Sequence, residues 1–262
     1  MKPAWTAEIW RHLDRAWLAD FAGRCPNVVF ATISGAHLYG FASPDSDVDL
    51  RGSFMLPIRS LVGMHPPDET VTVEDVAEGL EMDFVAHDLR KFARLMLRDN
   101  GYVLEQLYSP LVVTTTAIHD RLKELGQGCI TRGLYRHYRG FAHGRRKLLG
   151  EPGATVKTLL YAYRVYLTGI TALREGRIEA NICEMNKVFR LGIVDELVER
   201  KRTGAEQGKL ADGELASHAG ELDALEVALD KAHEDCKLPE SATVGEELAA
   251  LVVDARMALS GR

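Results

Sequence analysis

The chain has few cysteines, and none of them has the spacing of a metal or dithiol site. Only four occur in 262 residues, Cys25, Cys129, Cys183 and Cys236, and they lie far apart in the sequence. Structural zinc and redox sites need paired spacings such as Cys-x-x-Cys. We therefore expect reduced, structural thiols in a cytoplasmic protein.

Long hydrophobic runs are also missing. No apolar stretch approaches the ~20 residues that a membrane span needs. The first twenty residues carry scattered charges and lack the apolar core and cleavage site of a signal peptide. The formal net charge of −6 argues against a protein that coats nucleic acid without regard to sequence. We expect no membrane partner.

Strand patterns fill the first part of the chain, and helix patterns fill the second. Short runs of alternating or β-branched apolar residues predict strands at 28–33, 47–57, 69–73 and 79–87. A helix is expected at 5–21. From about residue 118 onward the strand pattern ends, and helices are expected at 118–125, 129–149, 156–173, 178–189, 214–236 and 245–259. The patterns predict an α+β core over residues 1–117, followed by an all-helical domain over residues 118–262.

The stretch from Ser34 to Gly52 organises the first part. A predicted buried strand runs into Gly35, whose backbone allows a close approach to an anion such as a phosphate. In Asp47-Val48-Asp49-Leu50 the strand period of two places both carboxylates on one face. A divalent cation with a preference for oxygen ligands, such as Mg²⁺, would make this pair favourable. Glycine turn and carboxylate pair together indicate a nucleoside triphosphate site.

This stretch resembles a known family. Gly35-Ala36, followed after ten residues by Asp47-Val48-Asp49-Leu50, resembles the nucleotidyltransferase signature of the DNA polymerase β superfamily. The longer run to Arg51-Gly52, with Asp83 and the segment Asn100 to Pro110, is similar to the predicted nucleotidyltransferases of bacterial RNA-repair operons. The resemblance is strong over residues 28–110 and weaker over residues 129–186. It does not extend to the acidic C-terminal region.

The resemblance implies a fold and a reaction. The expected core is a polymerase β-like mixed sheet with flanking helices, and the expected reaction is transfer of a nucleoside monophosphate from a nucleoside triphosphate to an acceptor hydroxyl. Two Mg²⁺ or Mn²⁺ ions ~3.5–4 Å apart would stabilise the attacking and leaving oxygens. By strand face and family pattern, the catalytic metal ligands are Asp47, Asp49 and Asp83. Glu81 lies on the same predicted face and is the reserve choice, whereas Asp88 is expected to cap a helix.

The expected nucleotide contacts fall in two places. The first group follows the first strand: Ser34, Gly35, Ala36, His37 and Ser46. The family usually has Ser where this chain has Ala36, so backbone N–H groups and the hydroxyls of Ser34 or Ser46 would have to serve instead. The second group, Lys157, Tyr161 and Arg164, shares one face of a predicted helix and suits a triphosphate tail and a stacked base. A structural alternative for that face is pairing with acidic residues elsewhere.

The residues indicate the type of reaction more clearly than they indicate the acceptor. Basic residues predominate over residues 129–190, where Tyr135, His137, Tyr138 and Arg139 suggest single-stranded RNA, with a core role as the alternative. By family analogy we expect an RNA end as acceptor and RNA-repair proteins as partners. Two other functions stay open: nucleotidylation of a protein or small molecule, and nucleotide binding without catalysis. For Arg51, a phosphate contact and an ion pair with a neighbouring carboxylate are both open.

Overall fold

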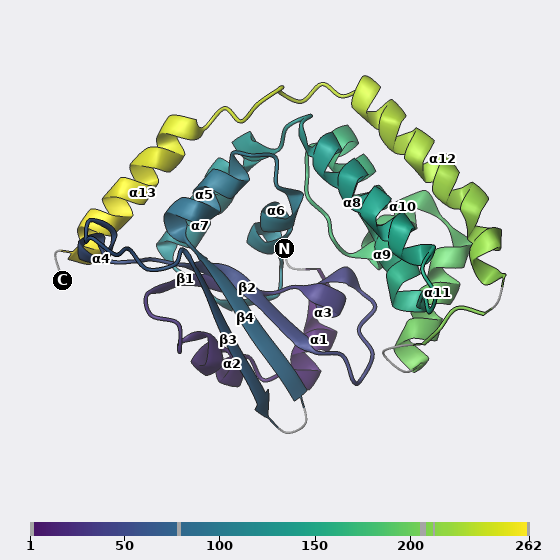
Figure 1. Cartoon of the computed structure of the whole chain (residues 1–262), viewed down its shortest axis with the longest axis horizontal. Coiled ribbons are helices and arrows are strands. Elements are labelled where there is room, and N and C mark those ends of the chain that lie inside the picture. The colour runs from purple at the N-terminus through teal and green to yellow at the C-terminus, as the bar shows by residue number, and fades with distance from the viewer. Residues whose placement is uncertain (1–2, 78–79, 205–207, 212, 261–262) are drawn as a thin grey trace. The chain divides into compact units, whose positions relative to one another are not determined.

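The computed structural model describes residues 3–77, 80–204, 208–211 and 213–260, and it divides into two compact units (Figure 1). The sheet unit comprises Met1–Gly35, Asp47–Cys129 and Ala242–Arg262, and the helical unit comprises Ala36–Ser46 and Ile130–Ser241. This division differs from the predicted one at residues 117 and 118. Residues 118–129 and 242–262 belong with the sheet, and the loop 36–46 belongs with the helices.

The sheet unit is built on one mixed sheet of five strands in the order β3-β4-β2-β1-β5. Strands β2 and β4 are parallel, and the other neighbouring pairs are antiparallel. The predicted α+β fold is confirmed, although β5 is too short to have been expected and the predicted start of β4 at residue 79 lies outside the described residues. The strands are β1 (Val28–Ile33), β2 (Val48–Phe54), β3 (Thr70–Ala77), β4 (Leu80–Asp88) and β5 (Val112–Thr114).

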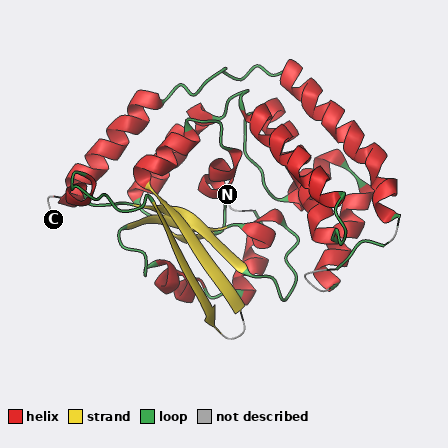
Figure 2. Ribbon diagram, viewed as in Figure 1, coloured by secondary structure: helices red, strands yellow, loops and turns green. Residues whose placement is uncertain are grey.

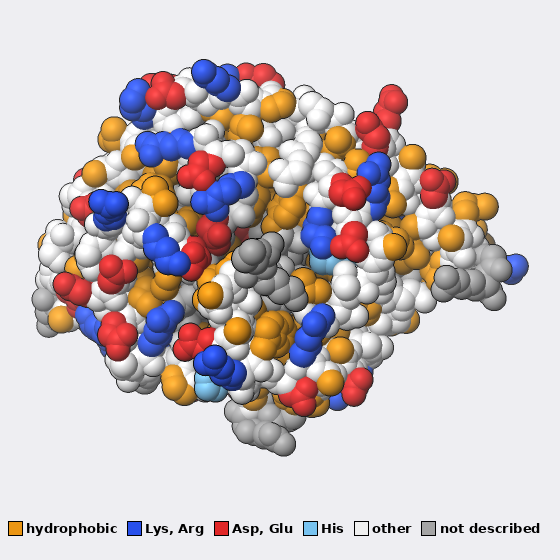
Figure 3. Space-filling view, turned by 180° about the vertical axis from the view of Figure 1, so that it is seen from behind, with side chains coloured by type: hydrophobic (Ala, Val, Ile, Leu, Met, Phe, Trp, Pro, Cys, Tyr) orange, Lys and Arg blue, Asp and Glu red, His pale blue; other side chains and the backbone are white. Residues whose placement is uncertain are grey.

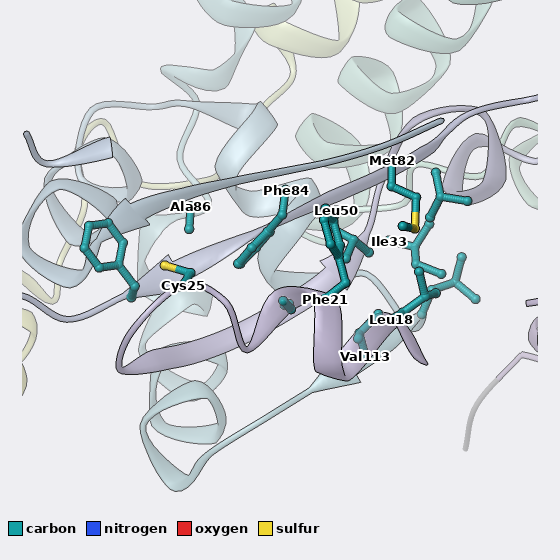
Figure 4. Close-up of a cluster of buried hydrophobic side chains, with 14 of the residues drawn as sticks. Leu18, Phe21, Cys25, Ile33, Leu50, Met82, Phe84, Ala86 and Val113 are labelled. Carbon is teal, nitrogen blue, oxygen red and sulfur yellow. The ribbon is translucent and has the colours of Figure 1, made fainter. Parts of the chain in front are cut away.

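Two N-terminal helices cover one face of this sheet. Leu18 and Phe21 pack against Ile33, Leu50 and other apolar strand residues to form a buried cluster (Figure 4). The single helix expected at 5–21 is instead two, α1 (Thr6–His12) and α2 (Arg15–Ala22). The helix breaks because the Asp14 carboxylate accepts hydrogen bonds from the N–H groups of Ala16 and Trp17 and so starts a new helix.

The opposite face of the sheet is covered by helices from the middle of the chain. On this face the Phe30 ring packs edge-on against Phe92 and is stacked on His119, with ring centroids 5.3 and 4.1 Å apart. Asp88 caps α5 as predicted, by accepting from the Arg90 N–H at 2.9 Å. The remaining helices of this unit are α4 (Ile58–Leu61), α5 (Leu89–Met96), α6 (Gly101–Tyr108), α7 (Ala117–Gly126), the 3-10 turn Gln127–Cys129 and α13 (Gly245–Ser260).

The helical unit is organised around one buried helix, α9 (Val156–Glu175). Figure 2 draws the helices of the chain in red and its strands in yellow. Gly169 lets α8 come close, because a Cβ there would lie 2.8 Å from the Tyr138 Cβ. Helix α11 was not predicted, and the predicted helix over 178–189 begins only after its Asn181 cap. The unit also contains α3 (Gly35–Tyr39, which starts in the sheet unit), α8 (Leu134–Leu149), α10 (Ile182–Phe189), α11 (Gly192–Thr203) and α12 (Glu214–Glu234). Within the described residues, no helix combines the length and apolarity of a membrane span.

Candidate active site

Gly35 sits where the first strand meets the second, and its lack of a side chain is what permits the contact. The Ser34 N–H donates to the Asp49 carbonyl at 2.8 Å, which ties the end of β1 to β2. Gly35 has a φ of +58°, and a Cβ at this position would lie 1.8 Å from Asp49 Oδ2. Glycine is therefore required both by its backbone conformation and by the carboxylate that lies directly against it.

Asp49 and Asp83 lie opposite each other on neighbouring parallel strands. The register of β2 and β4 pairs Asp49 with Asp83, while Val48 and Leu50 point into the core on the other face, both fully buried. Two carboxylates at paired positions on one face repel each other unless a cation stands near them. Register and alternation thus bring together two of the three predicted metal ligands.

The Arg51 guanidinium provides that cation. Its Nη2 donates to Asp49 Oδ1 at 2.9 Å and its Nη1 to Asp83 Oδ2 at 3.0 Å. Burial lowers the pKa of Arg51, but the Tyr102 hydroxyl and the two carboxylates raise it by more, so the net shift is upward. Of the two roles left open for Arg51, the structure shows the ion pair.

Asp47 and Glu81 each come two residues before a member of this pair. Asp47 comes one residue before β2 and is exposed, and Glu81 is an exposed residue of β4 two positions before Asp83. Within the described part of the chain, no three His, Cys, Asp or Glu side chains form a ready cluster for a metal ion. The donor chemistry nevertheless fits a divalent cation, because the facing oxygens of Asp49 and Asp83 already share one cation, the guanidinium.

Further along the same sheet face the polar character continues. Ser53 and His87 are paired in the same register, two positions beyond Arg51. The His87 Nδ1 hydrogen-bonds with the Thr70 hydroxyl at 3.0 Å. Burial, with smaller contributions from the Lys91 and Arg51 charges, lowers the pKa of His87 to about 4. His87 is therefore a neutral ring at physiological pH.

The predicted nucleotide contacts near the first strand are all in or next to α3 and its following loop. Ser34 is buried, and its hydroxyl has no hydrogen-bond partner among the described residues. Ala36 is buried and His37 half-buried on α3. Ser46 is buried as well, and its hydroxyl accepts from the Ser43 N–H at 3.0 Å. Ser46 thus closes the loop, whereas Ser34 presents a hydroxyl without such a structural task.

In the helical unit, two of the three predicted contacts support that loop. The fully buried Arg164 guanidinium lies 3.8 Å from the Tyr39 ring centroid, and the Tyr161 ring packs edge-on against Tyr39 at 5.5 Å. Arg145 lies over the Tyr161 ring at 4.7 Å. Burial and, to a smaller extent, the Arg164 charge lower the pKa of Arg145. Lys157, the third member, is half-buried on the same helix, α9.

Helices α10 and α11 also hold the loop 36–46, through residues that sequence reasoning missed. The buried Lys201 Nζ donates to the Ser43 hydroxyl at 2.6 Å. Arg202 Nη2 donates to the Gly40 carbonyl at 2.8 Å, and a Cβ on Gly40 would lie 2.5 Å from Asn181 Oδ1. These contacts span more than 140 residues of sequence, and Lys201 was missed because its helix was not predicted.

The residues considered for RNA stacking have other partners. Tyr138 is fully buried, so a stacking role does not hold for it. The Tyr135 hydroxyl donates to Asp230, and its ring is stacked on His233 with centroids 4.1 Å apart. Arg139 pairs with Asp230 and Glu226 of the acidic helix α12. Two arginines of α8, Arg139 and Arg146, are thus paired with acidic residues of α12. On the face of the molecule shown in Figure 3, basic and acidic side chains also lie next to one another.

Comparisons with known proteins show a family for this chain and a relative in an archaeon. A profile of the RNA repair pathway DNA polymerase beta family matches residues 10–254. The similarity therefore includes the acidic C-terminal region, to which the resemblance was not extended from the sequence alone. An uncharacterized protein of Methanocaldococcus jannaschii is 33% identical over 156 residues, which is 58% of this chain and 63% of that protein. The matched segment therefore covers less than two thirds of the relative's length.

Proposed function

This chain belongs to the RNA repair pathway DNA polymerase beta family, and on that premise we propose that it moves a nucleoside monophosphate from a nucleoside triphosphate to the hydroxyl of an RNA end. The observation that carries the proposal is the facing of Asp49 and Asp83 across β2 and β4, next to the bare backbone of Gly35. Polymerase β-like nucleotidyltransferases use this combination of glycine turn and carboxylates with divalent metals.

The proposed reaction assigns metal binding to all three carboxylates and proton transfer to one of them. Asp47, Asp49 and Asp83 would hold Mg²⁺ or Mn²⁺, and the bound ions would stabilise the charge on the attacking and leaving oxygens. Asp83 accepts the proton of the acceptor hydroxyl. The hydroxyl oxygen bonds to the α-phosphorus, the bond from that phosphorus to the bridging oxygen breaks, and pyrophosphate leaves.

Binding of the triphosphate is assigned to the two groups of residues named from the sequence. In this proposal the Ser34 hydroxyl and the N–H groups of Gly35 and Ala36 donate to phosphate oxygens, with His37 and Ser46 shaping the turn. Lys157 contacts the phosphate tail, and Tyr161 contacts the base. Arg164 is fully buried, so its proposed role is indirect: its guanidinium stacks on the Tyr39 ring and positions the loop 36–46.

The test is incorporation of an α-labelled nucleoside triphosphate with Mg²⁺ or Mn²⁺ and an RNA of defined ends. We expect label on the RNA and an equal amount of pyrophosphate. The Asp47→Ala, Asp49→Ala double variant serves as the blank, and Asp75→Ala is the matched control, since Asp75 lies on β3 and pairs with the exposed Arg24. Label transfer that survives unchanged in the double variant would overturn the mechanism.

The same experiment separates the alternatives. Label recovered on a protein or a small molecule instead of RNA would replace the acceptor and keep the reaction. A second candidate function, nucleotide binding without catalysis, is favoured by the missing hydroxyl at Ala36 and by the guanidinium seated on the carboxylate pair. Calorimetric binding of nucleotide with no pyrophosphate release, whatever the acceptor, would support that candidate.

A further inference from the structure

Arg51 is fixed by groups that are independent of the carboxylates it neutralises. Its Nε donates to the Tyr102 hydroxyl at 3.1 Å, and its Nη1 donates to the Leu50 carbonyl at 2.7 Å. Tyr102 belongs to α6, which packs on this side of the sheet, and Leu50 belongs to β2 itself. These two acceptors hold the guanidinium at this position whatever else the carboxylates bind.

The Arg51 guanidinium also bridges the two carboxylates. It donates to Asp49 Oδ1 and to Asp83 Oδ2. The Arg51 side chain is 14% exposed, whereas those of Asp49 and Asp83 are 32% and 33% exposed. Both carboxylates are therefore partly exposed to cations from solvent, whereas the Arg51 side chain is more buried than either of them.

We propose that the Arg51 guanidinium is a permanent counter-cation of the Asp49 and Asp83 carboxylates. It stabilises the site when no metal is bound, and it weakens the affinity of the site for a divalent cation. The inference rests on the proposed function, which places the metal at these carboxylates. Without metal, the guanidinium offsets the repulsion between two facing negative charges. With metal, its fixed positive charge stays next to the ion and opposes binding. The affinity of the site for its metal is then set by Arg51 as well as by the acids.

The test is titration of the nucleotide-free protein with Mn²⁺, in which the concentration of free Mn²⁺ is measured by electron paramagnetic resonance. Arg51→Gln removes the charge and keeps a donor, and Arg51→Lys keeps the charge and loses the fork. We expect Arg51→Gln to bind Mn²⁺ about tenfold more tightly than the native protein, and Arg51→Lys to bind within about twofold of it. Arg121→Gln removes an exposed arginine of α7 and is expected to leave the affinity for Mn²⁺ unchanged.

Folding is followed alongside, because Arg51→Gln leaves the carboxylates unbalanced. Its metal-free midpoint in urea is expected to fall and its stabilisation by Mn²⁺ to grow. If Arg51→Gln is unfolded without metal, recovery of its circular dichroism with millimolar Mn²⁺ supports the inference, and a chain that stays unfolded overturns it.

The outcomes separate the two levels of the argument. Mn²⁺ that binds the native protein, but binds Arg51→Gln equally or more weakly, overturns the role of Arg51 and leaves the proposed function intact. Mn²⁺ that binds neither protein overturns both the metal site and the inference. Tighter binding by Arg51→Gln that vanishes when Asp49→Asn is added supports the counter-cation at this site.

Discussion

At the scale of single residues, the site depends on contacts that tolerate no extra atom. Gly35 was predicted from the sequence as a turn glycine beside a phosphate. The structure adds a second requirement, because the Asp49 carboxylate occupies the volume where a side chain would begin. The pattern of alternating aspartates predicted which face they share, but it could not predict that Arg51 lies between Asp49 and Asp83. That contact requires Asp83 of β4, which lies 32 residues after Arg51 in the sequence.

Gly35→Ala is expected to lower both stability and transfer. Its Cβ would push the Asp49 carboxylate away, and the left-handed backbone would add about 1–2 kcal/mol of strain. Gly153→Ala is the matched control, because Gly153 also has a positive φ, of +86°, but open space around it. We expect a similar loss of free energy of unfolding in both variants from strain, but a loss of label transfer only in Gly35→Ala. Equal transfer by the two would contradict this view of Gly35.

At the scale of elements, local signals predicted most helices and strands, and long-range contacts decided where they belong. The Asp88 cap of α5 follows from local chemistry and was predicted. Its pairing with Arg256 of α13, and the assignment of α13 to the sheet unit, have no local signal. Strand β5 has only three residues, too few to give a periodic pattern. Helix α11 does have helical spacing in its buried residues Val194, Leu197, Val198 and Lys201, and this signal was overlooked.

The Asp88–Arg256 pair yields a prediction for how α13 is held. The Asp88 side chain is fully buried and that of Arg256 is 6% exposed, and Arg256 also donates to the Leu56 carbonyl at 2.7 Å. Arg256→Ala leaves a buried carboxylate without its counter-ion, so we expect the free energy of unfolding to fall by ~3–5 kcal/mol. Arg90→Ala, which breaks a surface pair with Glu69, should cost less than ~1 kcal/mol. Urea denaturation of both variants measures the difference, and equal losses would contradict the role given to Arg256.

At the scale of the whole molecule, the sequence predicted the α+β class and the family, and its expected division at residues 117 and 118 differs from the division into compact units. The glycine turn enters a loop, 36–46, that belongs to the helical unit, where Arg164, Lys201 and Arg202 hold it. No composition change marks this, because the loop is joined to its unit by side-chain contacts and not by its neighbours in the chain. The predicted function of the helical domain in binding nucleotide or acceptor stays a prediction.

The central claim is that the facing carboxylates of β2 and β4 carry the chemistry, and it is tested most directly by comparing Asp83 with its neighbour. Under single-turnover conditions with labelled nucleoside triphosphate, Mg²⁺ and RNA, we expect Asp83→Asn to slow label transfer by at least about 10²-fold. Glu81→Gln, two residues away on the same strand face, should transfer at the native rate. Rapid transfer by Asp83→Asn together with a loss in Glu81→Gln would contradict the account.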